Sequence, residues 1–123
     1  MRLAPVNGHD ILNRTSDFAD RIIKLHAAIP KHGVGKNIAA QLVRSGTSIG
    51  AQIAEANFAK SQADFVSKLQ GALQESEETR FWIKRLVSTG LIKAARLDDI
   101  LRESSEITAI IVTIVNKSRG EAK

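Results

Sequence analysis

The stretch RSGTSIGAQIAEA at residues 44–56 combines glycines with hydroxyl side chains, the residue types that bind phosphate groups. A Walker-type phosphate loop has the pattern Gly-x-x-x-x-Gly-Lys followed by Ser or Thr, between a strand and a helix. Only residues 47–49 separate Gly46 from Gly50, and neither the lysine nor a preceding strand-like run is present. The spacing therefore does not fit a phosphate loop.

The same glycines have an explanation in helix packing. Gly46, Gly50 and Ala54 recur at every fourth residue, so on a helix they form one column of small residues. Such a column lets a neighbouring helix approach closely. Close contact would offset the cost of about 1 kcal/mol that each interior glycine imposes on a helix. The neighbouring hydroxyl groups can bond to carbonyl groups one turn earlier. We therefore predict close helix packing along this column.

Residues suited to catalysis or metal binding do not occur at useful spacings. None of His9, His26 and His32 follows a glutamate by three residues or lies four residues from another histidine, which excludes the usual di-iron and zinc pairs. The chain has no cysteine, and no serine occupies a strand-to-helix elbow. The glutamates within 75–78 and 103–106 are expected to face outward and to pair at helical spacings with Arg80, Lys84 and Arg102. We expect no catalytic site, metal, cofactor or small-molecule substrate, and no enzymatic activity.

The charge balance favours an anionic partner. Lysine and arginine number 18 against 13 aspartates and glutamates, a formal net charge of +5, which suits RNA or DNA. A basic surface that is merely solvated is the alternative. Lys31, His32 and Lys36 cluster at the first expected connection, and Lys93 lies near the third. The candidates for phosphate contact are Arg14, Arg21, Lys24, Lys36, Arg44, Lys84, Arg85 and Arg96.

Aromatic and apolar residues indicate a protein interface rather than base stacking. One tryptophan, four phenylalanines and no tyrosine are too few for an extended stacking platform for single-stranded nucleic acid. Phe81 is expected to point outward beside Trp82, a pairing typical of protein–protein surfaces. The run ITAIIVTIV at 107–115, with Ile110 and Val112, is apolar nearly all round. It should be covered both by the bundle and by another subunit.

Apolar residues recur at a helical period throughout the chain. Pro30 ends the first helix, Ser61 caps the third and Gly90 ends it. We predict helices at about 10–29, 36–58, 61–89 and 94–116, with a frayed tail at 117–123. Short connections between them predict one all-α domain over 1–123, an antiparallel up-down-up-down four-helix bundle.

The sequence also favours a cytoplasmic location. No apolar run is long enough to span a membrane, and the N-terminal residues lack the pattern of a secretory signal. The absence of cysteine agrees with a reducing compartment.

Three segments resemble a known family. They are QLVRSGTSIGAQIAEA at 41–56, DFVSKLQGALQESEET at 64–79 and LVSTGLI at 86–92. They are similar to bacterial four-helix-bundle proteins encoded by intervening sequences in 23S ribosomal RNA genes. That group is similar in fold to the accessory variability protein of diversity-generating retroelements, the partner of a reverse transcriptase.

This resemblance implies a homopentameric barrel of bundles with a basic character suited to nucleic acid, and it brings no catalytic residues. The function we expect is non-enzymatic binding of nucleic acid, or of a nucleic-acid enzyme such as a reverse transcriptase. A protein-interaction scaffold without nucleic-acid contact is the alternative. Two positions depart from the family. Lys93-Ala94-Ala95 stands where relatives often carry Ser, Asp or Glu, and Gly50 where many carry proline.

Overall fold

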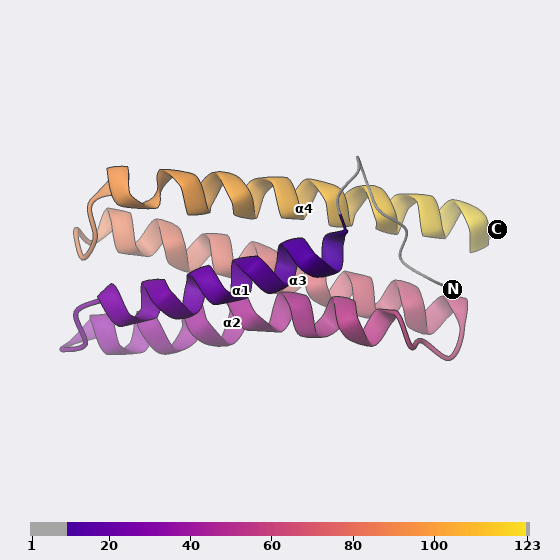
Figure 1. Ribbon diagram of the computed structural model, residues 1–123, viewed down its shortest axis with the longest axis horizontal. Helices are drawn as coiled ribbons and strands as arrows, with labels where there is room; N and C mark the ends of the chain where they lie inside the picture. Colours follow the sequence, from indigo (N-terminus) through magenta and orange to yellow (C-terminus); the bar gives the residue numbers. More distant parts are fainter. Residues whose placement is uncertain (1–9, 123) are drawn as a thin grey trace.

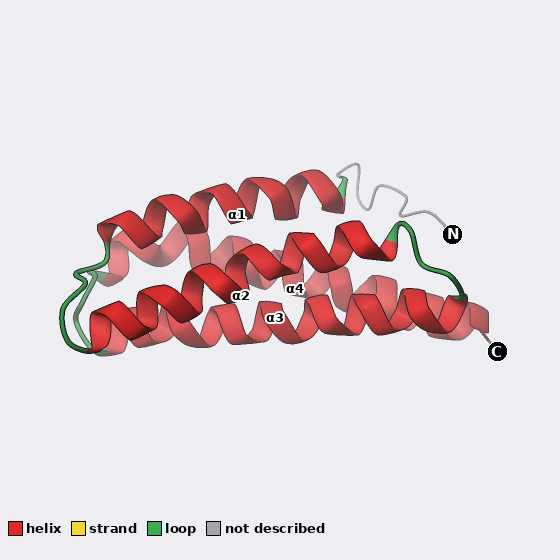
Figure 2. Ribbon diagram, turned by 90° about the horizontal axis from the view of Figure 1, so that it is seen from below, coloured by secondary structure: helices red, strands yellow, loops and turns green. Residues whose placement is uncertain are grey.

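The computed structural model describes residues 10–122, which contain four helices and no strand. The helices are α1 (Ile11–Ala28), α2 (Val34–Ala56), α3 (Gln62–Ser88) and α4 (Ala94–Ala122). They run antiparallel with short connections, and each packs against the next (Figures 1 and 2). α4 returns beside α1, and this pair has the sparsest contact of the four neighbouring pairs. The predicted all-α four-helix bundle is confirmed.

Local sequence signals account for the helix ends. Asp10 accepts the backbone N–H of Leu12 at 2.9 Å at the start of α1, and Ser61 accepts that of Asp64 at 3.0 Å at the start of α3. Gly33, with φ of 59°, precedes α2. α2 starts at Val34, two residues before the predicted start at 36, and it ends at Ala56 instead of 58. Gly90, with φ of 73°, follows α3 as expected.

The predicted tail belongs to α4. The helix continues to Ala122, past the expected end at 116, whereas residue 123 lies outside the described residues. Ser118 is buried, and its carbonyl group accepts a hydrogen bond from the side chain of Gln62 at 3.0 Å. Contact with the start of α3 thus supports a segment whose polar composition predicted fraying.

Side chains from all four helices fill the core, and hydroxyl groups lie among them. Thr79 donates to Ser45 at 3.0 Å, joining α3 to α2. Ser76 and Thr108 share a hydrogen bond of 2.7 Å that joins α3 to α4. These buried hydroxyl groups therefore have partners, as the burial of polar groups requires. The largest fully buried side chains are Phe18, Ile11, Ile22, Leu42, Ile49, Ile53, Leu69, Ile83, Leu86, Leu97, Ile107 and Ile111.

The column of small residues is only partly a packing seam. A β-carbon at Gly46 would lie 2.8 Å from two side-chain carbons of Ile22, so α1 approaches α2 closely there. At Gly50 the nearest atoms belong to Thr15, at an ordinary 3.4 Å. Ala54 is exposed, so its predicted role in close packing is wrong. A step of four residues rotates by about 40° on a helix, which turns Ala54 away from α1.

The hydroxyl groups of residues 44–56 are used inside the helix. Thr47 donates to the carbonyl oxygen of Val43 at 2.7 Å, and Ser48 donates to that of Arg44 at 2.6 Å. The segment is helical throughout, without the open backbone of a phosphate loop. The prediction of a helix in place of a phosphate loop is confirmed.

Within residues 10–122, no helix combines the length and apolar composition that a bilayer span requires.

Candidate nucleic-acid interface

Arg14, one of the predicted phosphate-contacting residues, joins two helices instead. Its guanidinium group donates from Nη2 to Glu103 Oε1 at 2.7 Å and from Nε to Oε2 of the same carboxylate at 3.2 Å. A further ion pair reaches Glu106 at 3.1 Å. The hydrogen bond with Glu103, followed by that with Glu106, raises the pKa of Arg14. Arg14 thus connects α1 to α4, the neighbouring pair of helices with the sparsest contact, and two carboxylates match its charge.

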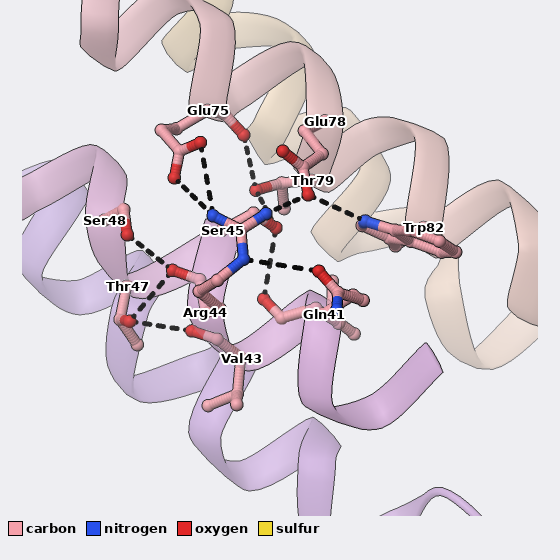
Figure 3. A network of polar contacts seen from close by, with 11 residues as sticks. Gln41, Val43, Arg44, Ser45, Thr47, Ser48, Glu75, Glu78, Thr79 and Trp82 are labelled. Atoms are coloured by element: carbon pink, nitrogen blue, oxygen red, sulfur yellow. Dashed lines mark hydrogen bonds and ion pairs between the residues drawn. The ribbon is translucent and has the colours of Figure 1, made fainter. Parts of the chain in front are cut away.

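Arg44 has a similar role between α2 and α3. Its guanidinium group forms ion pairs with Glu78 and, at 3.1 Å, with Glu75 (Figure 3). Glu78 also accepts a hydrogen bond from the indole nitrogen of Trp82 at 3.1 Å. The Arg44 hydrogen bond, and then that from Trp82, lower the pKa of Glu78. The charge of Arg44 is thus matched by two carboxylates of α3, but its side chain is 47% exposed, so its role in phosphate contact stays a prediction.

The acids pair across helices more than along them. The sequence predicted pairs at helical spacings, and Arg80–Glu77 at 3.4 Å is one. Arg102 also pairs along its own helix, but with Asp99 at 3.4 Å and not with a glutamate. The other glutamates of 75–78 bind Arg44 on α2, and those of 103–106 bind Arg14 on α1. Among the described residues, no three of His, Cys, Asp and Glu group as metal ligands would.

The other six predicted cations have no ion pair within the described part of the chain. Five of them are exposed, and Arg85 is half-buried with its guanidinium group 4.8 Å from the centre of the Phe81 ring. Their charges are therefore available to an external anion. They are Arg21, Lys24, Lys36, Lys84, Arg85 and Arg96.

The antiparallel topology brings the two basic connections together. The α1–α2 and α3–α4 connections lie at the same end of the bundle (Figure 1). The first turn of α2 also lies beside the α3–α4 connection, because a β-carbon at Gly35 would lie 3.8 Å from the Leu91 side chain. The same β-carbon would be 1.9 Å from the Pro30 carbonyl oxygen, so position 35 must be glycine for the chain to pass this close to Pro30. Clusters that are separate in sequence therefore come together on the surface of one end of the bundle.

We call this surface the basic end. Residues 21–36 and 84–96, which build it, contain no aspartate or glutamate. Two helices also begin there without an acidic residue in the first turn: α2, where Gly33 provides no side-chain cap, and α4. Because α1 and α3 end at the same place, the partial charges of the helix N-termini and C-termini offset one another, and the side chains supply the positive charge. The cations of the basic end are Arg21, Lys24, Lys31, Lys36, Lys84, Arg85, Lys93 and Arg96.

The predicted interface residues fall into two groups. Phe81 is 48% exposed and Val112 is 37% exposed, whereas Trp82 is half-buried against the core. Ile110 is only 9% exposed and belongs to the core, so its assignment to an intersubunit surface is corrected. Its own bundle covers it because the apolar run of α4 packs on more than one side within a single chain.

Phe58 is a residue that the sequence did not single out. It is 86% exposed at the α2–α3 connection, the end of the bundle opposite the basic end. It lines an open surface depression with Lys60, Asp64 and Lys68, where both signs of charge are present. Its position after the last apolar residue of α2 is the only signal that would have indicated exposure.

Residues 8–113 match the model of the 23S rRNA-intervening sequence protein family. The chain belongs to this family. The match includes α1, α2, α3 and most of α4. It contains all eight cations of the basic end.

A solved structure agrees with membership in the 23S rRNA-intervening sequence protein family. It is the crystal structure of a protein of unknown function from the S23 ribosomal protein family of Bacteroides thetaiotaomicron, with a TM-score of 0.78 and 35% identity. The alignment covers 86% of this chain and 98% of that one. No curated protein matches the chain.

Proposed function

We propose that this member of the family is a non-enzymatic, oligomeric protein that binds nucleic acid through its basic end. The observation that carries the proposal is the surface formed by Lys36 with Lys84 and Lys93, whose side chains have no ion pair within residues 10–122. Cations on a rigid frame suit the phosphate backbone, which supplies most sequence-independent affinity for nucleic acid. We also propose a cytoplasmic location, which the absence of cysteine supports.

The salt dependence of binding tests this proposal. Fluorescence anisotropy would measure the affinity for a labelled RNA and a DNA oligonucleotide at several salt concentrations. Each neutralised phosphate of duplex DNA contributes about −0.9 to the slope of log affinity against log salt. We expect a slope of several units, because the basic end offers several cations. No binding of either nucleic acid at low salt would reject the proposal.

Assembly into a homopentameric barrel is also part of the proposal. It is supported by the family resemblance and by Val112, an apolar residue 37% exposed on α4. A symmetric ring repeats each basic end once per subunit and so strengthens the attraction for a polyanion. Light scattering coupled to gel filtration would measure the subunit number. A monomer at all concentrations would contradict this part.

A scaffold that binds only protein is the competing function, and the exposure of Phe81 favours it. The partner of such a scaffold is not identified, whereas a nucleic-acid enzyme such as a reverse transcriptase, which the family resemblance favours, would bind through the basic end. A partner-bound complex that is insensitive to salt, together with no affinity for nucleic acid, would support the scaffold.

A further inference from the structure

Phe81 is an exposed ring held in a fixed environment. The rings of Phe81 and Trp82 are nearly perpendicular, with a centroid distance of 4.9 Å and an interplanar angle of 82°. The guanidinium group of Arg85 lies over the ring, 4.8 Å from its centre. Even so, 48% of Phe81 is exposed. Arg85 occupies one face of the ring, so a flat partner would have to stack on the opposite, exposed side of Phe81.

One neighbour of Phe81, Trp82, is held in place by contacts that reach Arg44 on α2. Trp82 donates its indole N–H to Glu78 at 3.1 Å, and Glu78 forms an ion pair with Arg44 (Figure 3). An aromatic side chain that is held in place before binding loses little conformational freedom when a ligand stacks on it. The contacts from Arg44 to Trp82 therefore preorganise the surroundings of Phe81.

Phe81 lies beside the basic end. Lys84 and Arg85 follow it by three and four residues on α3, so all three share one side of that helix. Neither cation has an ion pair among the described residues. A ring next to unpaired cations complements a nucleotide, which joins a flat base to a phosphate. An apolar protein segment would leave those charges without partners.

We propose that Phe81 stacks on an unpaired base of nucleic acid whose phosphates bind the basic end. This is a single stacking position, not the extended platform that the small number of aromatic residues argues against. The inference rests on the proposed function and adds that the preferred ligand has unpaired bases. Recognition of RNA and single-stranded DNA commonly combines backbone contacts with bases stacked on aromatic or arginine side chains.

The test compares a single-stranded oligonucleotide with an abasic oligonucleotide that has the same number of phosphates. Both are measured by anisotropy with wild-type protein, Phe81→Ala and Phe81→Leu. Stacking of one base predicts that wild type binds the base-containing strand about tenfold more tightly than the abasic strand. Both variants should lose this preference while retaining the affinity for the abasic strand and its salt slope, because no charge is removed.

Phe58→Ala is the matched control, since Phe58 is exposed at the opposite end. This variant should keep the wild-type preference for bases. Circular dichroism would confirm that each variant is folded, and Phe81→Leu retains apolar bulk if the alanine variant is unstable.

Several outcomes would overturn the inference. An unchanged preference in Phe81→Ala would exclude stacking but leave the proposed function intact if the salt slope persists. A change in oligomer size without a change in base preference would assign Phe81 to a protein contact instead. Failure of the wild-type protein to bind either strand at low salt would reject the proposed function itself.

Discussion

Gly46 lies against Ile22 so closely that a β-carbon on residue 46 would be 2.8 Å from both Cγ1 and Cγ2 of Ile22. Real β-carbons do not approach other atoms so closely, and Ile22 is fully buried with a branched, stiff side chain. The contact thus fixes the separation of α1 and α2 near the middle of both helices.

Gly46→Ala should destabilise the protein by up to about 2 kcal/mol, because overpacking against Ile22 costs about 1–3 kcal/mol and the helix propensity of alanine offsets about 1 kcal/mol of it. Gly50→Ala is the matched control, since its nearest neighbour, Thr15, is at an ordinary 3.4 Å. Alanine also favours the helix by about 1 kcal/mol, so this variant should be neutral or more stable. Urea unfolding would measure both. Equal effects at the two glycines would contradict a localised contact.

Arg14→Gln should cost more stability than Arg44→Gln. Arg14 makes two hydrogen bonds with one partly buried carboxylate, and such charged bonds contribute about 1.5–3 kcal/mol. The Arg44 side chain is 47% exposed, and exposed ion pairs contribute about 0.2–1 kcal/mol. Denaturant unfolding at low and high salt would compare them. A larger destabilisation by Arg44→Gln would contradict the proposed importance of the α1–α4 bridge.

Reversal of charge at the basic end should weaken nucleic-acid binding. Lys36→Glu combined with Lys93→Glu should reduce the magnitude of the salt slope by about 0.9 for each phosphate that is no longer neutralised. Lys60→Glu combined with Lys117→Glu changes the net charge equally but at the opposite end. Anisotropy titrations of both double variants separate a local site from a general charge effect. Equal reductions in affinity would show that only the net charge matters.

The contribution of Glu78 to stability should depend on pH. Because the Arg44 ion pair lowers its pKa in the folded state, the unfolded chain takes up a proton first as the pH falls. The stabilisation is therefore fully present above the ordinary value of 4.5 and is lost as the pH falls through the folded pKa. Wild type and Glu78→Gln should differ most near neutral pH and converge in acid.

Chemical denaturation at several pH values would measure this difference. The same comparison in an Arg44→Gln background is the control, since it removes the main cause of the lowered pKa. The pH dependence assigned to Glu78 should then shrink. A difference that grows in acid would have the wrong sign for this ion pair.

Sequence alone determined the four helices and most of their ends. The helical period identifies the buried side of each segment, as at Phe18 and Leu42, because that side is set by rotation about a single helix axis. Ser61 and Gly90 marked helix ends because capping and positive φ are local properties. The close approach at Gly46 also followed from the spacing, although Ala54 showed that the column turns away with length.

Which charges are free depends on how the helices pack against one another. Arg14 and Arg44 resembled the other surface cations in sequence, but carboxylates on neighbouring helices neutralise them. Ile110 was assigned outward because a period does not reveal how many helices pack around a segment. The basic end arises because antiparallel packing brings residues 21–36 and 84–96 to one end of the bundle. Pairing across helices depends on side-chain reach and on helix position, neither of which a one-dimensional pattern contains.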